Sequence, residues 1–256
     1  ALTQAGNITI DVANTKTLTY SGAALNLGAN TLTLGGEGRL SNTYVLGLNN
    51  ASSKLLLSSS ITVDRVSTSL ASLGLDVDGD STVTSLSVGH ITPVSIASGK
   101  TLSGAITVTA GSIKLGETGT LASTVSMSGG TLDADETFTI SGALSQAGSI
   151  TIDVATGKTL TYSGASLSLG ANTLTMSGGG TLSNTNALAL DNADSLLTLA
   201  GILTIGDVDG TAASNSGKGI IVTSSATLGD YDLSAESYLA IAEDKTLAGQ
   251  LNLQSN

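Results

Sequence analysis

Three aspartates on alternate positions form the sharpest chemical cluster in this sequence of 256 residues. Asp76, Asp78 and Asp80 surround Gly79, and carboxylates at this spacing can converge on Ca²⁺, a hard cation that prefers oxygen ligands. The complete calcium-loop pattern is missing, because no Glu stands where the bidentate ligand belongs. Two interpretations therefore stay open, a Ca²⁺ site and a solvated acidic corner, and no other cofactor is expected.

A second acidic group contains Asp133, Asp135 and Glu136. Paired carboxylates can hydrolyse glycosidic bonds, so a polysaccharide-degrading β-helix enzyme is one alternative. Such an enzyme normally lines its cleft with aromatic rings, whereas this chain has five Tyr, one Phe and no Trp. The single histidine, His90, has no serine in a G-x-S-x-G context to activate. We expect His90 to be exposed beside a turn, and we expect the protein not to be an enzyme.

Four Thr-x-Thr pairs raise ice binding as a further alternative. In a strand with leucine pointing inward, both threonines of a pair point outward, about 6.6–6.8 Å apart. An ice-binding face also requires such pairs to stack on successive turns of one face. The pairs are Thr17/Thr19, Thr31/Thr33, Thr159/Thr161 and Thr173/Thr175.

The charge and composition exclude several classes of partner. The formal net charge is −11, from 20 acidic and 9 basic residues, which opposes binding to nucleic acid or anionic lipid. No apolar run of about 18 residues could span a membrane as a helix. The chain has no Cys, which excludes disulfides and thiolate metal sites. It carries no signal-peptide pattern, although a mature secreted protein would look the same.

An internal duplication organises the chain. Residues 1–42 and 143–184 align without a gap at an offset of 142 and differ at 10 of 42 positions. The aliphatic positions hardly change, which is typical of a conserved core rather than of a reacting site. A second match, Asp207–Gly210 with Asp76–Gly79, has an offset of 131 and predicts a loss of about eleven residues. We therefore expect one elongated domain, 1–256, built from units 1–142 and 143–256, the second shortened.

Short alternating segments such as NITIDV (7–12) and KTLTY (16–20) predict strands with one buried face. Glycine and asparagine between them predict tight corners. Many short strands with internal repetition favour an all-β parallel β-helix, or β-solenoid, of about 12 or 13 turns of roughly 20 residues. A pair of β-sandwiches is the alternative. In the solenoid the central leucines of the duplicated strands should be buried: Leu18, Leu32, Leu160 and Leu174.

The phrases GKTLTYSG (157–164) and GANTLTLGG (28–36) resemble repetitive β-helical regions of bacterial surface proteins, such as autotransporter passengers and haemagglutinin-like adhesins. The resemblance implies a secreted or cell-surface, rod-like structural protein, with surface glycans or other cells as partners. It carries no catalytic residue. A passive spacer is a further interpretation.

The two ends of the chain lack an obvious polar cap or covering helix. Bare strand edges invite pairing with another chain, so we expect head-to-tail self-association through the terminal turns. If the ends are instead boundaries within a longer protein, they predict a longer solenoid in that protein.

Overall fold

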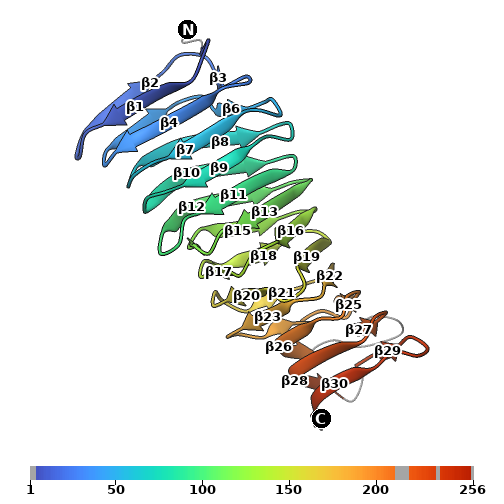
Figure 1. Ribbon diagram of the computed structural model, residues 1–256. Coiled ribbons are helices and arrows are strands. Elements are labelled where there is room, and N and C mark those ends of the chain that lie inside the picture. The colour runs from blue at the N-terminus through green and yellow to red at the C-terminus, as the bar shows by residue number, and fades with distance from the viewer. Residues whose placement is uncertain (1–3, 211–218, 235–236, 255–256) are drawn as a thin grey trace. The chain divides into compact units, whose positions relative to one another are not determined.

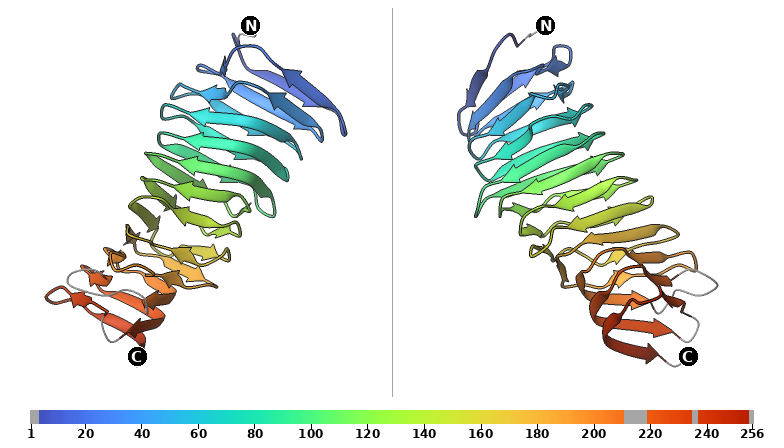
Figure 2. Two further views of the ribbon diagram at one scale, coloured as in Figure 1. Left: turned by 180° about the vertical axis from the view of Figure 1, so that it is seen from behind. Right: turned by 45° about the vertical axis from the view of Figure 1, so that its right-hand side comes forward.

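The chain forms a parallel β-solenoid of about 11 turns in the computed structural model, which describes residues 4–210, 219–234 and 237–254. The described residues contain strands and connecting loops and no helix. Figure 1 shows the strands stacked turn upon turn within each part of the chain, and Figure 2 shows the same stacking from two other sides. The predicted solenoid is confirmed. Because neighbouring strands are parallel, the antiparallel β-sandwich alternative is wrong.

The chain divides into two compact units, residues 1–126 and 127–256. In unit 1, successive solenoid turns contribute to two sheets, A and B. Sheet A contains, in spatial order, β1 (Ile8–Val12), β4 (Thr31–Gly36), β7 (Lys54–Leu57), β9 (Gly74–Val77), β11 (Thr92–Ile96) and β13 (Ser112–Gly116). Sheet B contains β2 (Thr17–Tyr20), β3 (Leu25–Asn26), β5 (Arg39–Asn42), β6 (Leu46–Leu48), β8 (Thr62–Thr68), β10 (Ser81–Val88), β12 (Thr101–Val108) and β14 (Thr120–Leu121). Strand β15 (Thr124–Met127) spans the boundary between the units.

Unit 2 repeats the arrangement. Its sheet A strands are β16 (Thr131–Ala134), β19 (Ile150–Val154), β22 (Thr173–Gly178), β25 (Leu196–Leu199), β27 (Gly219–Val222) and β29 (Leu239–Ile241). Its remaining strands are β17 (Phe138–Ile140), β18 (Leu144–Gln146), β20 (Thr159–Tyr162), β21 (Leu167–Ser168), β23 (Thr181–Asn184), β24 (Leu188–Ala189), β26 (Thr204–Gly210), β28 (Ala226–Ser234) and β30 (Leu247–Gln254).

Many solenoid turns are longer than the predicted 20 residues, so about 11 are present rather than the predicted 12 or 13. Ile8 pairs with Leu32, 24 residues later, whereas Leu75 pairs with Val94, 19 residues later. Corner loops absorb the difference, because each strand must still meet its neighbour in register.

Aliphatic side chains stack in columns between the sheets. In unit 1 one column consists of consecutive register partners, all at most 1 % exposed: Leu32, Leu55, Leu75, Val94 and Leu115. In unit 2 a similar column contains Leu132, Ile152, Met176, Leu199 and Val222. Each such side chain contributes roughly 1.5–3 kcal/mol on burial. Packing within these columns stabilises the strands, so the residue types at outward-facing positions are free to vary.

Of the four leucines predicted to be buried, Leu32, Leu160 and Leu174 are at most 1 % exposed. The prediction for Leu18 is wrong, because its side chain is 43 % exposed. Leu18 lies in β2, on the first solenoid turn, where its register partner Leu40 covers one side only. A leucine in an inward register therefore stays exposed when no turn covers its other side.

The structure also corrects the alignment of the second copy. Asp76 lies in β9 of sheet A, whereas Asp207 lies in β26 of sheet B, so the two DVDG sequences are not structurally equivalent. The counterpart of β26 is β8: Val63 pairs with Leu40 as Ile205 pairs with Leu182. The inferred loss of eleven residues is therefore wrong. The match between two four-residue turn motifs suggested that they were equivalent. The pairing of strands in the sheets shows that they are not.

Candidate functional site: an arginine-containing hollow

Sheet B of each unit has an outward bend that breaks strict alternation. In β8, Val63 and Val66 are buried, and the two residues between them, Asp64 and Arg65, both face outward. Strand β10 behaves in the same way, with Thr84 and Ser85 exposed between two buried residues. Two consecutive outward side chains on neighbouring strands concentrate polar groups at this bend.

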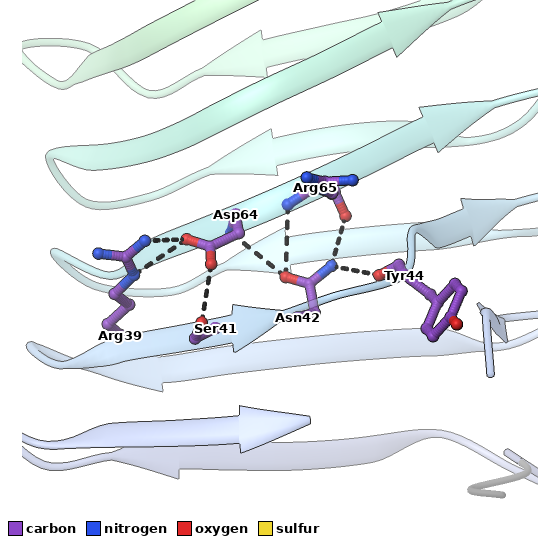
Figure 3. Close-up of polar contacts among 6 residues, drawn as sticks. All are labelled: Arg39, Ser41, Asn42, Tyr44, Asp64 and Arg65. Atoms are coloured by element: carbon purple, nitrogen blue, oxygen red, sulfur yellow. Dashed lines mark hydrogen bonds and ion pairs between the residues drawn. The ribbon is translucent and has the colours of Figure 1, made fainter. Parts of the chain in front are cut away.

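Asn42 holds the bend in unit 1. Its buried amide nitrogen donates to the carbonyl oxygens of Tyr44 at 2.7 Å and Arg65 at 2.8 Å. Its amide oxygen accepts from the backbone N–H groups of Asp64 at 3.2 Å and Arg65 at 3.3 Å. Figure 3 shows this amide between the backbone of β8 and Tyr44. All four hydrogen-bonding positions of the amide are used, which satisfies backbone groups that a bent strand would otherwise leave unpaired.

A short polar chain orients the first arginine. The Asp64 carboxylate accepts from Arg39 Nε at 2.9 Å and forms an ion pair with Arg39 Nη2 at 2.7 Å. Its other oxygen accepts from the hydroxyl of Ser41 at 2.9 Å. The contact is visible at one end of the group in Figure 3. Two contacts to one guanidinium fix its orientation better than a single point contact can.

Arg39 and Asp64 line a hollow of about 460 Å³ on the surface of unit 1. We name it the arginine hollow and define it by Arg39, Asp64 and Arg65 together with three hydroxyl residues of β10: Thr84, Ser85 and Ser87. The sequence contains two arginines, and both lie here. The Asp64 carboxylate neutralises Arg39 by forming an ion pair with it. The Arg65 side chain is exposed and forms no ion pair within the described part of the chain. The hollow therefore offers one uncompensated guanidinium beside hydroxyl donors, which suits an anionic group.

The equivalent surface of unit 2 carries the opposite charge. Asn184 makes the same contacts as Asn42, accepting from the N–H groups of Gly206 and Asp207 and donating to the carbonyl oxygens of Asn186 and Asp207. Asp207 therefore occupies the place of Arg65. In the register of sheet B, Asp207 pairs with Asp230, and Asp209 pairs with Asp232. We call these four residues the carboxylate ladder.

The carboxylate ladder perturbs its own titration. Partial burial raises the pKa of Asp207 above its ordinary value, and the negative charges of Asp230, Asp232 and Asp209 raise it further. A hydrogen bond from the backbone of Val208 acts in the opposite direction. The ladder is thus a site of like-charge repulsion that a cationic partner would relieve.

The two units can be compared directly, because the same backbone bend carries arginine in unit 1 and aspartate in unit 2. No protein-family model, curated protein or solved structure matches this chain. The functional interpretation therefore depends on the contacts, charges and exposed edges of the chain itself.

The three aspartates predicted to bind Ca²⁺ are engaged in different contacts. Asp76 lies in β9 and forms an ion pair with Lys54 of β7. Asp78 is exposed, and the Asp80 carboxylate accepts from the backbone N–H of Thr101 at 2.9 Å. Over residues 4–210, 219–234 and 237–254, no group of three or more acidic, His or Cys side chains is arranged to hold a metal ion. The Ca²⁺ site stays a prediction.

The three residues of the second acidic group also lie in different surroundings. Asp133 lies within β16, Asp135 is exposed, and Glu136 forms an ion pair with Lys158. His90 is exposed beside a turn, as expected, and its Nδ1 accepts from the backbone N–H of Ile91. In the register of sheet A, Asp133 pairs with Asp153. The polysaccharide-degrading alternative and the expectation that the protein is not an enzyme both stay predictions.

The Thr-x-Thr pairs lie on different faces. Thr17/Thr19 and Thr159/Thr161 are in sheet B, whereas Thr31/Thr33 and Thr173/Thr175 are in sheet A. The pairs within each copy therefore do not stack on one another. In sheet A, Thr175 has Thr151 and Thr198 as neighbours, but Thr173 faces Leu196. The paired array on which ice binding depends is missing for these four pairs.

The sequence analysis missed the arginine hollow because the polar run that begins at Asp64 lacks the strict alternation by which strands were predicted. The structure places Asp64 to Thr68 within β8. The available signal was the pair of outward residues between Val63 and Val66, which interrupts the period of two without ending the strand. The occurrence of both arginines within this part of the chain was a second signal.

Across the part of the chain that the structure describes, there is no helix of the length and apolarity needed to cross a membrane.

Proposed function

We propose that this chain is an extracellular structural protein, a β-solenoid whose terminal turns stack on those of a second copy. The observation that carries the proposal is the exposure of inward-register apolar side chains on the outermost described turns, beside the outer edges of β1 and β29. Such edges are templates for pairing with another chain.

At the first turn, apolar side chains of unit 1 face an open space. Strand β2 pairs with β5 on one side, and β1 is the outermost strand of its sheet. A hollow of about 140 Å³ opens between these strands, lined by residues that include Ile10, Leu18 and Leu40. Tyr20 and Leu25 also line it. In the interior of the solenoid, the same inward positions are covered by the next turn.

At the last turn, unit 2 presents a matching edge. Strand β30 pairs with β28, and β29 is the outermost strand of its sheet. Leu251 is 42 % exposed, Leu253 is 73 % exposed and Ile241 is 46 % exposed. The strand edge and the apolar residues together form a surface that another parallel turn would cover.

A contact between a first turn and a last turn uses two different surfaces, so it leaves one free surface of each kind after every addition. A contact of this type that does not close into a ring produces a filament. Repeat arrays in general need their end units covered to remain soluble. Stacking on a second copy would cover these edges.

The extracellular assignment is supported by the resemblance of the repeated phrases to bacterial surface proteins and by the acidic composition. An adhesive role is an expectation from that resemblance. In the structural and in the adhesive role alike, the solenoid would serve as a scaffold that projects a surface or connects copies, rather than as a catalyst.

Lysine on an edge strand blocks pairing, so Leu18→Lys and Leu253→Lys test the proposal. Sedimentation velocity over a wide concentration range should show large assemblies of the wild-type chain and smaller species of both variants. Ile202→Lys is the matched control, because Ile202 is 76 % exposed and lies between β25 and β26. A wild-type chain that stays monomeric at all concentrations, or variants that assemble as the wild type does, would show that the edges are not the contact.

A further inference from the structure

The two bends of sheet B share one framework and differ in charge. Asn42 and Asn184 make corresponding sets of four hydrogen bonds, so Arg65 and Asp207 leave equivalent points of the backbone. The two copies share this support and differ in the side chain, which is a cation in unit 1 and an anion in unit 2.

The next strand shows the same contrast. Ser85 pairs with Arg65 in unit 1, and Asp230 pairs with Asp207 in unit 2. Ser87 pairs with Ser67, where unit 2 pairs Asp232 with Asp209. Neutral hydroxyl residues thus surround the arginine, whereas carboxylates occupy all four corresponding positions in unit 2.

Equivalent backbones give the two surfaces equivalent spacing. Neighbouring strands lie about 4.8 Å apart, and alternate residues of one strand about 6.8 Å apart. Carboxylates at this spacing lie within reach of a guanidinium, which can bind a carboxylate through two parallel hydrogen bonds. Hydroxyl groups beside Arg65 can donate to the remaining carboxylate oxygens.

We infer that the arginine hollow of one copy binds the carboxylate ladder of a second copy through the sheet B faces. The net charge of −11 makes most encounters between copies repulsive. The arginine hollow contains both arginines of the chain, with one carboxylate among them, and is therefore a locally attractive surface for an acidic partner. Within the ladder, Asp207 and Asp232 form no ion pair with Lys or Arg in the described part of the chain, and Asp230 accepts from Asn252 at 2.6 Å.

This contact is separate from stacking at the ends. It uses outward residues of β8, β10, β26 and β28, whereas end stacking uses the edges of the first and last turns. Each copy has one hollow and one ladder, so binding at one surface leaves the other free for a further copy. A structural protein could thereby be joined side to side as well as end to end.

Charge reversal tests the inference, with Leu18→Lys and Leu253→Lys present in every protein to suppress end stacking. Arg65→Asp and Asp207→Arg should each lower the association constant at low ionic strength at least about tenfold, because like charges then face each other. The combined Arg65→Asp/Asp207→Arg protein should recover association, because the two charges are exchanged. Lys100→Asp makes the same change in net charge outside the hollow and should leave association within about twofold of the parent.

Sedimentation velocity measures association, and thermal unfolding confirms that each variant is folded. Association of the parent should disappear in about 1 M salt, where the Debye length is about 3 Å. Three results would overturn the inference: a monomeric parent at low salt, an unchanged Arg65→Asp variant, or failure of the charge exchange to restore association. Titration of the monomer with galacturonate oligomers is the fourth arm. If these oligomers release heat of binding that requires Arg65, and the copies do not associate with one another, the ligand of the hollow is an acidic saccharide instead.

Discussion

Leu18 and Leu160 occupy the same place in the duplicated sequence, yet Leu18 is 43 % exposed and Leu160 is 1 % exposed. Leu160 lies between Phe138 and Leu182 on the neighbouring turns. Leu18 has Leu40 on one side. Sequence context is nearly identical at the two positions, so the difference in burial arises from the position of each turn in the stack.

This pair gives a matched test of the core. Leu160→Ala should lower the free energy of unfolding by about 2–5 kcal/mol, because it leaves a cavity among buried side chains. Leu18→Ala removes the same atoms from a partly hydrated position and should cost less than about 1.5 kcal/mol. Urea unfolding at low protein concentration measures both. Equal losses for the two variants would contradict the assigned difference in burial.

The buried amide at the bend should be a second point of sensitivity. Asn42→Ala leaves the carbonyl oxygens of Tyr44 and Arg65 and two backbone N–H groups without their partner. An unsatisfied buried polar group costs about 1–3 kcal/mol, so we expect a loss of at least that size. Asn14→Ala, at an exposed position, should change stability by less than about 0.5 kcal/mol. A tolerated Asn42→Ala would mean that water replaces the amide.

The sequence predicted the solenoid because alternation and duplication record which residues face the core. NITIDV and KTLTY became β1 and β2, and three of four selected leucines are buried. The arginine hollow was beyond the same reasoning. Arg39 and Asp64 are 25 residues apart, and the solenoid turns vary in length, so no fixed repeat predicts that they meet. The alignment of Asp207 with Asp76 failed for a different reason, because a four-residue match was preferred to the constant offset of 142 that aligns Asp207 with Arg65.

The calcium prediction can be tested directly despite the contacts of Asp76. Binding would require Asp76 to leave Lys54, so any affinity should be weak, at millimolar concentration or above. Differential scanning calorimetry with and without Ca²⁺ should show a rise in melting temperature that the Asp76→Asn/Asp78→Asn/Asp80→Asn variant lacks. The same melting temperature for the wild type with and without millimolar Ca²⁺ would exclude the site.

The carboxylate ladder should make the stability of unit 2 depend on pH. The folded-state pKa of Asp207 is raised above its ordinary value of 3.8. Between that value and the raised pKa, the folded chain binds more protons than the unfolded chain, so stability falls as pH rises through this window. At neutral pH the full cost of ionisation is present, and Asp207→Asn should raise the melting temperature. Below the ordinary aspartate pKa both proteins carry a neutral group at this position, so the difference in melting temperature should vanish.

Melting curves of the two proteins from acid to neutral pH measure this difference, with Asp194→Asn as an exposed control of equal charge change. A stabilisation by Asp207→Asn that persists unchanged in acid would show that repulsion within the ladder is not its cause.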